Sequence, residues 1–233
     1  MSIEVHQLSK IYGTQKAVNE VSFMAKPGEI VGFLGPNGAG KSSTMKMIAG
    51  YMQSDGGRIR VCGKEVTPAT IESKKKIGYL PELNPLYADM YVREYLEFVA
   101  GLHKVAEKKK AIEEAIERTG LSPEAHKLIH QLSKGYKQRV GLAAAIIHEP
   151  EVLILDEPTT GLDPNQIIEI RNLIKSLGKD KTILFSTHIL QEVEAICDRV
   201  IIIHKGKIVA DVFLGEIQQS ATSLEDFFRG LTQ

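Results

Sequence analysis

The feature that most constrains this chain is a glycine-rich loop at residues 35–43, which reads Gly-Pro-Asn-Gly-Ala-Gly-Lys-Ser-Ser. An apolar run at residues 30–34 precedes the loop, and residues 44–49 have the composition of a helix. The pattern G-x-x-x-x-G-K-[ST] between a strand and a helix is typical of a phosphate-binding loop. Glycines let backbone N–H groups approach an anion closely, and a helix start adds N–H donors and a positive dipole end. The loop therefore predicts binding of a nucleoside triphosphate.

Two residues of this loop have predicted side-chain roles. We expect Lys41 to reach the outer phosphates and the Ser42 hydroxyl to bind Mg²⁺. The other residues of the phosphate site are Gly35, Pro36, Asn37, Gly38, Ala39, Gly40 and Ser43. The alternative, a glycine turn that opens an ordinary helix, is the weaker interpretation because the flanking strand and helix give the pattern its meaning.

The remaining sequence predicts an α/β fold. The apolar run at residues 152–155 is typical of a strand buried on both faces of a sheet. Residues 182–185 predict the next strand, and residues 200–203 and 207–210 predict a hairpin that turns at residues 205–206. We expect one mostly parallel sheet. Residues 84–150 instead place apolar side chains at helical spacing and offer no strand candidate. Residues 3–23 alternate only loosely, so we expect short strands and turns there.

These patterns predict a single domain over residues 1–233. A nucleotide-binding core would comprise residues 1–83 and 151–233, and residues 84–150 would form an inserted helical subdomain. The fold class is that of a P-loop NTPase, with a RecA-like, mostly parallel sheet and an antiparallel β portion at the start of the chain. Asp163 and Pro164 predict the cap and first position of a helix that continues to Gly178.

Composition excludes several classes of protein. The 29 basic and 29 acidic residues balance, so no general attraction to nucleic acid is expected. No run approaches 18 apolar residues and no secretory segment opens the chain, so we expect a cytoplasmic protein that does not itself cross a membrane. Cys62 and Cys197 lack the spacing of a metal site and are expected to be free thiols.

A second cluster of polar residues follows two of the predicted strands. Asp156 suits the Mg²⁺ shell, and Glu157 suits the base that polarises an attacking water. His188 follows the next strand directly, and its imidazole could hydrogen-bond the γ-phosphate at the same edge of the sheet. The alternatives are two carboxylates that cap the next turn and a passive histidine at a helix start.

Ser133 is a natural N-cap for a helix over residues 134–148. In a functional interpretation, the Ser133 hydroxyl, the Gly135 N–H and the helix start together form a second anion site. Because residues 35–43 already hold the phosphates, this second site makes sense if it contacts a nucleotide bound by another copy of the chain.

The order of these motifs resembles that of the ATP-binding cassette family over nearly the whole chain. Five segments carry the resemblance: the Walker A loop, the signature, the Walker B strand with its catalytic glutamate, the D-loop and the switch histidine. In that order they are similar to residues 35–43, 132–135, 152–157, 160–163 and His188.

The resemblance implies further contacts. Tyr12 is similar to the aromatic residue that stacks on adenine, with Val18 beneath the ring. The resemblance also implies a head-to-tail homodimer that encloses two ATP molecules. Each nucleotide would lie between Lys41 of one copy and Ser133 and Gly135 of the other.

Two departures from the family pattern stand out. The signature usually reads Leu-Ser-Gly-Gly-Gln, whereas Lys134 and Tyr136 replace its first glycine and its glutamine here. The lysine either favours the anion or faces solvent. Glu82 stands where the family usually has a glutamine that contacts Mg²⁺ and water, so it is a candidate metal ligand whose extra negative charge the metal must neutralise.

Residues 78–82, 132–136 and 157–164 look most like the exporter branch with separate ATPase and membrane subunits, and within it like gliding-motility-associated ATP-binding subunits. We therefore expect an ATPase on the cytoplasmic face of the membrane that couples hydrolysis to export. Residues 82–100 would pass the motion to a permease.

Two alternatives remain. A soluble non-transport ATPase of related fold would carry long coiled-coil insertions or two cassettes, which this chain lacks. A P-loop GTPase or small-molecule kinase would not explain residues 132–139, and the guanine motif Asn-Lys-x-Asp does not appear.

Overall fold

A computed structural model describes residues 1–219 and 223–232 of the chain. Its main sheet has six strands in the order β10-β9-β3-β8-β7-β6. All neighbouring pairs are parallel except β10 with β9. The strands are β3 (Ile30–Leu34), β6 (Ile77–Leu80), β7 (Val152–Asp156), β8 (Thr182–Thr187), β9 (Arg199–His204) and β10 (Lys207–Phe213). The predicted mostly parallel sheet is confirmed.

A second, antiparallel sheet has the order β2-β1-β4-β5. Its strands are β1 (Ile3–Tyr12), β2 (Gln15–Ala25), β4 (Gly56–Val61) and β5 (Lys64–Glu65). Helix α1 (Lys41–Ile48) contacts strands of both sheets. A cluster of buried side chains fills the space between them. The sheet pair thus fixes the position of the helix that follows the glycine-rich loop.

The expectation of short strands at the start of the chain was wrong. β1 has 10 residues and β2 has 11, and Gly13, at φ 59°, lies in the tight turn that joins them. Their register shifts at bulges, and the left-handed backbone of Gln7 and Glu20 marks these irregularities. Because each bulge flips the side chains that follow it to the opposite face, the alternation in the sequence looks loose although the hairpin is long.

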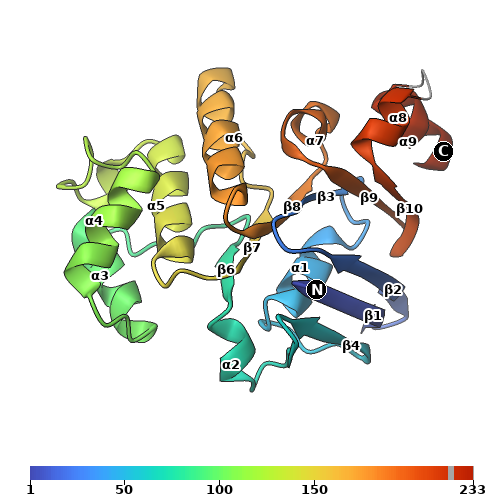
Figure 1. Ribbon diagram of the computed structural model, residues 1–233, viewed down its shortest axis with the longest axis horizontal. Helices are drawn as coiled ribbons and strands as arrows, with labels where there is room; N and C mark the ends of the chain where they lie inside the picture. Colours follow the sequence, from blue (N-terminus) through green and yellow to red (C-terminus); the bar gives the residue numbers. More distant parts are fainter. Residues whose placement is uncertain (220–222, 233) are drawn as a thin grey trace.

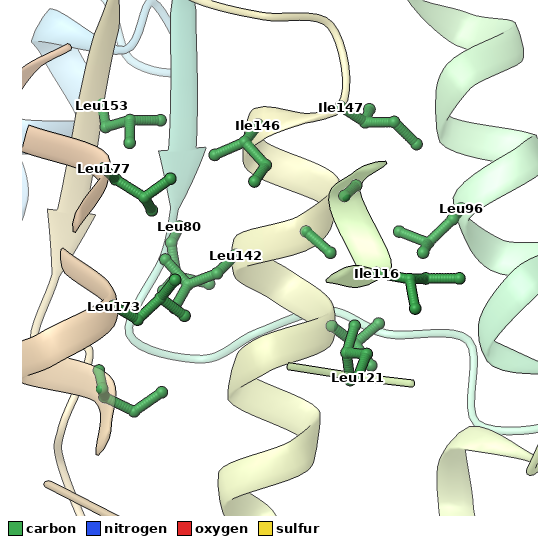
Figure 2. Packing of buried hydrophobic residues seen from close by; sticks show 14 of the residues in the cluster. Leu80, Leu96, Ile116, Leu121, Leu142, Ile146, Ile147, Leu153, Leu173 and Leu177 are labelled. Atoms are coloured by element: carbon green, nitrogen blue, oxygen red, sulfur yellow. The ribbon is translucent and has the colours of Figure 1, made fainter. Parts of the chain in front are cut away.

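The middle of the chain is helical, as expected. Apart from one isolated bridge, its described elements are α3 (Val92–Leu102), α4 (Lys108–Arg118), the 3₁₀ turn η1 (Ile129–Gln131) and α5 (Lys134–Ile146). Figure 2 shows α5 between Leu80 and Leu173 on one side and Leu96 and Ile116 on the other. One cluster of buried side chains therefore extends from the main sheet and α6 into the helices of residues 84–150. The division into a nucleotide-binding core and a helical subdomain stays a prediction.

Two helices cover the face of the main sheet opposite α1, as Figure 1 shows. They are α6 (Pro164–Gly178), which begins and ends as predicted, and α7 (Leu190–Ile196). Three short helices were not predicted: α2 (Ile71–Lys74), α8 (Leu214–Gln219) and α9 (Leu224–Thr232). In the described part of the chain, no helix is both long and apolar enough to span a bilayer.

Candidate active site

The glycine-rich loop connects the end of β3 to the start of α1. The Lys41 side chain is only 5% exposed, and its Nζ donates hydrogen bonds to the carbonyls of Gly35 at 2.8 Å and Pro36 at 3.3 Å. Gly40 adopts φ 106°, and a Cβ there would lie 2.3 Å from the carbonyl oxygen of Ala17. Glycine is therefore required at this turn both by its backbone conformation and by the close approach of β2.

A cavity of about 440 Å³ lies beside this loop. It brings together most of the loop with residues that follow β6, β7 and β8, and these are far apart in the sequence. Its lining residues are Ala17, Asn37, Gly38, Gly40, Lys41, Ser42, Ser43, Glu82, Glu157, Thr160 and His188. The carboxyl ends of parallel strands meet at one edge of a sheet, which is where α/β folds place their ligands.

Asp156 ends β7 and is 1% exposed. Its Oδ1 accepts hydrogen bonds from Ser186 Oγ at 2.6 Å and from Ser42 Oγ at 3.1 Å. Burial raises the pKa of Asp156, the two serine hydroxyls act in the opposite direction, and the nearby charges of Glu82 and Glu157 raise it further. The carboxylate is thus joined to the loop serine and placed where a positive charge would stabilise it.

Glu157 is the centre of the polar cluster. Its Oε1 lies 3.3 Å from Lys41 Nζ, and its Oε2 lies 2.8 Å from His188 Nδ1. Thr160 Oγ1 donates to the same Oε2 at 3.3 Å. Glu157 has a left-handed backbone, with φ 51°, which costs energy for a residue with a side chain and is found preferentially at functional sites. The structure thus brings both Lys41 and His188 into contact with the Glu157 carboxylate, while their catalytic roles stay predictions.

Ser186 is a site residue that the sequence did not single out. Besides Asp156 Oδ1, its hydroxyl contacts the backbone N–H of Glu157, which donates to it at 3.0 Å. Asp156 and Ser186 are direct neighbours in the register of β7 and β8. The available signal was a polar residue directly after the apolar residues 183–185, but the strand register was needed to interpret it.

The residues expected to contact adenine lie at the edge of this region. Tyr12 is 47% exposed, and its hydroxyl lies 3.5 Å from Ser43 Oγ and 3.1 Å from Met52 Sδ. Val18 is fully buried in the core between the sheets and offers a ligand no exposed surface. Tyr12 therefore lies beside the loop, while its stacking on adenine and a contact between Val18 and the base stay predictions.

The predicted second anion site lies elsewhere in the fold. Ser133 caps α5, because its Oγ accepts a hydrogen bond from the Tyr136 N–H at 3.3 Å. Gly135 is buried against the side chain of Gln166, which a Cβ would approach to 2.8 Å. Neither Ser133 nor Gly135 lines the cavity beside the glycine-rich loop. The cap is confirmed, while anion binding at this helix start stays a prediction.

Phosphate loop, buried carboxylates and histidine at one edge of a parallel sheet define a P-loop nucleoside triphosphatase. The model of the family described as "ABC transporter" matches residues 18–160. The chain is 43% identical over 215 residues to the bacitracin transport ATP-binding protein BcrA of Bacillus licheniformis, covering 90% of this chain and 69% of that protein. It is 38% identical over 211 residues to the linearmycin resistance ATP-binding protein LnrL of Bacillus subtilis (strain 168), covering 89% and 68%.

Solved structures agree with this assignment. The ATP-binding subunit of an ABC transporter superposes over 100% of both chains, with a TM-score of 0.89 and 31% identity. The dimeric post-hydrolysis state of the ATP-binding cassette MJ0796, bound to ADP and Pi, has a TM-score of 0.82 and 25% identity, covering 91% of this chain and 98% of that one. The chain belongs to the ABC transporter family, and it is an ATP-binding subunit with ATPase activity. The finer likeness to gliding-motility-associated subunits stays a prediction.

Proposed function

We propose that this chain hydrolyses ATP to drive export through a separate membrane permease. The observation that carries the proposal is the contact of both Lys41 and His188 with the buried carboxylate of Glu157 at one cavity. The names of three relatives support a role in export. Two are BcrA and LnrL, described above. The third is the Nod factor export ATP-binding protein I of Paraburkholderia xenovorans (strain LB400), which is 37% identical over 214 residues, covering 90% of this chain and 70% of that protein. A soluble non-transport ATPase is the alternative that these names do not favour.

Each polar group has a proposed role in hydrolysis. The loop N–H groups and Lys41 hold the phosphates, so that the γ-phosphate faces Glu157. Glu157 accepts a proton from the attacking water. Because its carboxylate is buried, bulk water has little access to it. His188 orients Glu157 through their shared hydrogen bond, and as an imidazolium it can also donate its second N–H to the transferred phosphate.

The residues of the cavity fit a bound Mg²⁺. Ser42 and Glu82 line the cavity, and the Ser42 hydroxyl lies 3.1 Å from Oδ1 of Asp156, which does not line it. Within the described residues, no cluster of three or more His, Cys, Asp or Glu side chains forms a complete cage. Mg²⁺ commonly binds through one or two protein ligands, with phosphate and water supplying the rest. The ion would neutralise phosphate charge and stabilise the Asp156 carboxylate, whose pKa burial raises.

A head-to-tail homodimer is the proposed working form. Ser133 is exposed at the start of α5 and does not line the cavity of its own copy, so its proposed phosphate contact would be made to the partner's nucleotide. The dimeric structure of the cassette MJ0796 supports a dimer as the working form.

The permease is proposed to contact the helical region on the cytoplasmic face of the membrane. Several large apolar side chains are exposed around α3, and two of them, Tyr87 and Phe98, meet edge to face with ring centroids 5.6 Å apart. The exposed set is Leu83, Tyr87, Tyr91, Phe98 and Leu102. Gathered apolar side chains on a surface are typical of a protein interface. The balanced charge of the chain supports the absence of a nucleic-acid partner.

Glu157→Gln tests the ATPase and dimer proposals together. The variant keeps the phosphate loop but loses the proton acceptor, so it should bind Mg-ATP, fail to hydrolyse it and elute from gel filtration as a dimer. Lys41→Ala is the matched control, because it removes the phosphate contact and should prevent both ATP binding and dimer formation. A Glu157→Gln protein that stays monomeric at saturating Mg-ATP would refute the dimer. A wild-type protein that does not turn over ATP would refute the catalytic roles.

A further inference from the structure

A fully buried carboxylate joins the two segments that carry Glu157 and His188. Glu192, in α7, has 0% exposed surface. Its Oε1 accepts a hydrogen bond from Thr159 Oγ1 at 2.5 Å, and its Oε2 accepts one from Thr187 Oγ1 at 2.6 Å. Thr159 follows Glu157 by two residues, and Thr187 directly precedes His188. One side chain therefore connects both segments.

The Thr187 hydroxyl is fixed from two directions. It donates its single proton to Glu192 Oε2, and it accepts a hydrogen bond from the Ile189 N–H at 3.1 Å. These bonds hold the backbone on both sides of His188, whose own side chain is exposed and touches Glu157. The orientation of the histidine thus depends on the position of a carboxylate that it does not contact.

The chemistry of this position requires a carboxylate. Both bonding partners are hydroxyl donors, and an ionised carboxylate offers an acceptor oxygen to each, whereas an amide offers only one. A buried carboxylate is costly unless it is paired and hydrogen-bonded. Arg171 of α6 supplies the compensating charge, with Nη2 3.9 Å from Glu192 Oε1. If the only role of this residue were to fill the core, an apolar side chain would do so without the free-energy cost of burying a charge.

We propose that Glu192 is a positioning residue for ATP hydrolysis, which sets the distance between Glu157 and His188 by holding Thr159 and Thr187. This inference rests on the proposed role of Glu157 in activating water. The direct bond between Glu157 and His188 is 2.8 Å long, and it can form only if both backbones are correctly placed. Glu192 fixes that placement without lining the cavity.

The first test compares kcat and ATP affinity in Glu192→Ala. A 1 Å misplacement of catalytic groups can cost about 100-fold in rate, so kcat should fall at least about tenfold. The dissociation constant for ATP should stay within about twofold, because Glu192 makes no hydrogen bond or ion pair to residues 35–43. Glu192→Gln keeps one acceptor and should give an intermediate kcat. If kcat is retained in Glu192→Ala, or if ATP affinity falls in parallel with it, the inference is wrong.

Glu29→Gln is the matched control for a purely structural effect. Glu29 is also buried and bonded to a cation, with Oε1 2.6 Å from Arg199 Nε. It precedes β3 and so lies at the end of the strand opposite the cavity. This variant should lower the melting temperature and leave kcat per folded molecule unchanged. An equal fall in kcat in Glu29→Gln and Glu192→Ala would show that the loss of any buried carboxylate lowers kcat to the same extent. That result would overturn the inference.

Thr159→Val keeps the test decisive if Glu192→Ala does not fold. Valine preserves the shape of the side chain and removes its hydroxyl donor, so kcat should fall several-fold, and Thr159→Ser should recover at least about half of that loss by restoring the donor. Equal activities of the serine and valine variants would contradict the inference. Full activity in Glu157→Gln would instead refute the proposed role of Glu157 in activating water, which separates the two failures.

Discussion

The stability of this protein should depend on the protonation of one buried histidine at the junction between α5 and the sheet. His148 Nε2 lies 3.1 Å from the carbonyl oxygen of Ile77 in β6, so the neutral ring donates through that nitrogen. Its ring stacks on that of His103 with centroids 3.7 Å apart and planes 12° from parallel. The buried Nδ1 has no hydrogen-bond partner in the part of the chain that the structure describes. Protonation would therefore create a buried N–H without an acceptor.

Burial lowers the pKa of His148 to about 4, from the ordinary value of 6.5. His103 and Lys181 act in the same direction, while the contact with Ile77 and the charge of Glu149 act against it. Burial also lowers the pKa of His103. The unfolded chain thus binds the proton more readily than the folded one, and the free energy of unfolding falls as the pH drops from 6.5 toward 4. A pKa difference of this size corresponds to about 3 kcal/mol in total, and to roughly 2.5 kcal/mol by pH 4.5.

Urea unfolding of the wild type, His148→Phe and His148→Leu between about pH 7.5 and pH 4.5 tests this expectation. Both variants lose the bond to the Ile77 carbonyl, so both should be less stable than the wild type at neutral pH. The difference in free energy of unfolding between the wild type and each variant should shrink by about 2.5 kcal/mol at about pH 4.5, because only the wild type has an imidazole to protonate at this position. If all three proteins lose stability in parallel, His148 does not titrate as the burial argument requires.

Three further changes test individual contacts. Glu82→Gln should keep substantial ATPase activity, because an amide oxygen can still face the metal; a hundredfold loss in a steady-state assay would show that the carboxylate has a specific task. Gly78→Ala should destabilise the fold by about 2 to 3 kcal/mol in thermal unfolding, since its Cβ would lie 2.2 Å from the backbone oxygen of Ala145. Ser133→Ala should cost about 1 kcal/mol of stability through loss of the α5 cap, and an unchanged melting temperature would contradict that role.

The sequence was sufficient where the determining interactions are local. The phosphate loop is a continuous segment, so its glycines and Lys41 identify it without any tertiary information. The boundaries of α6 follow from the Asp163 cap, whose Oδ1 accepts a bond from the Gln166 N–H at 3.0 Å, and from Pro164 at the first helical position. The buried strands were also predictable, because a strand covered on both faces must be apolar along its length.

The hydrogen bonds that hold the site residues in place join distant parts of the chain, so they could not be predicted from local sequence. The bond between Ser186 and Asp156 exists only because β8 lies beside β7 in one particular register. The carboxylate of Glu192 could not be linked to Thr159 without knowing that α7 covers the segment after β7. Each of these partners lies about 30 residues from the other in the chain, and polar residues of the same kind are common on surfaces.

The structure shows that the unusual lysine of the signature is exposed to solvent, and it also shows which segment that side chain covers. The sequence left Lys134 either near an anion or in solvent. In the structure its Nζ lies 2.0 Å from the point that a Cβ would occupy on Gly161, so the side chain covers the segment that follows Glu157 in the same copy. Gly161 has no Cβ and adopts φ 72°, which makes room for the lysine and requires glycine on backbone grounds as well. Lys134 can therefore replace the usual glycine in this fold because Gly161 lies opposite it. Its positive charge lies between the start of α5 and the segment that follows Glu157.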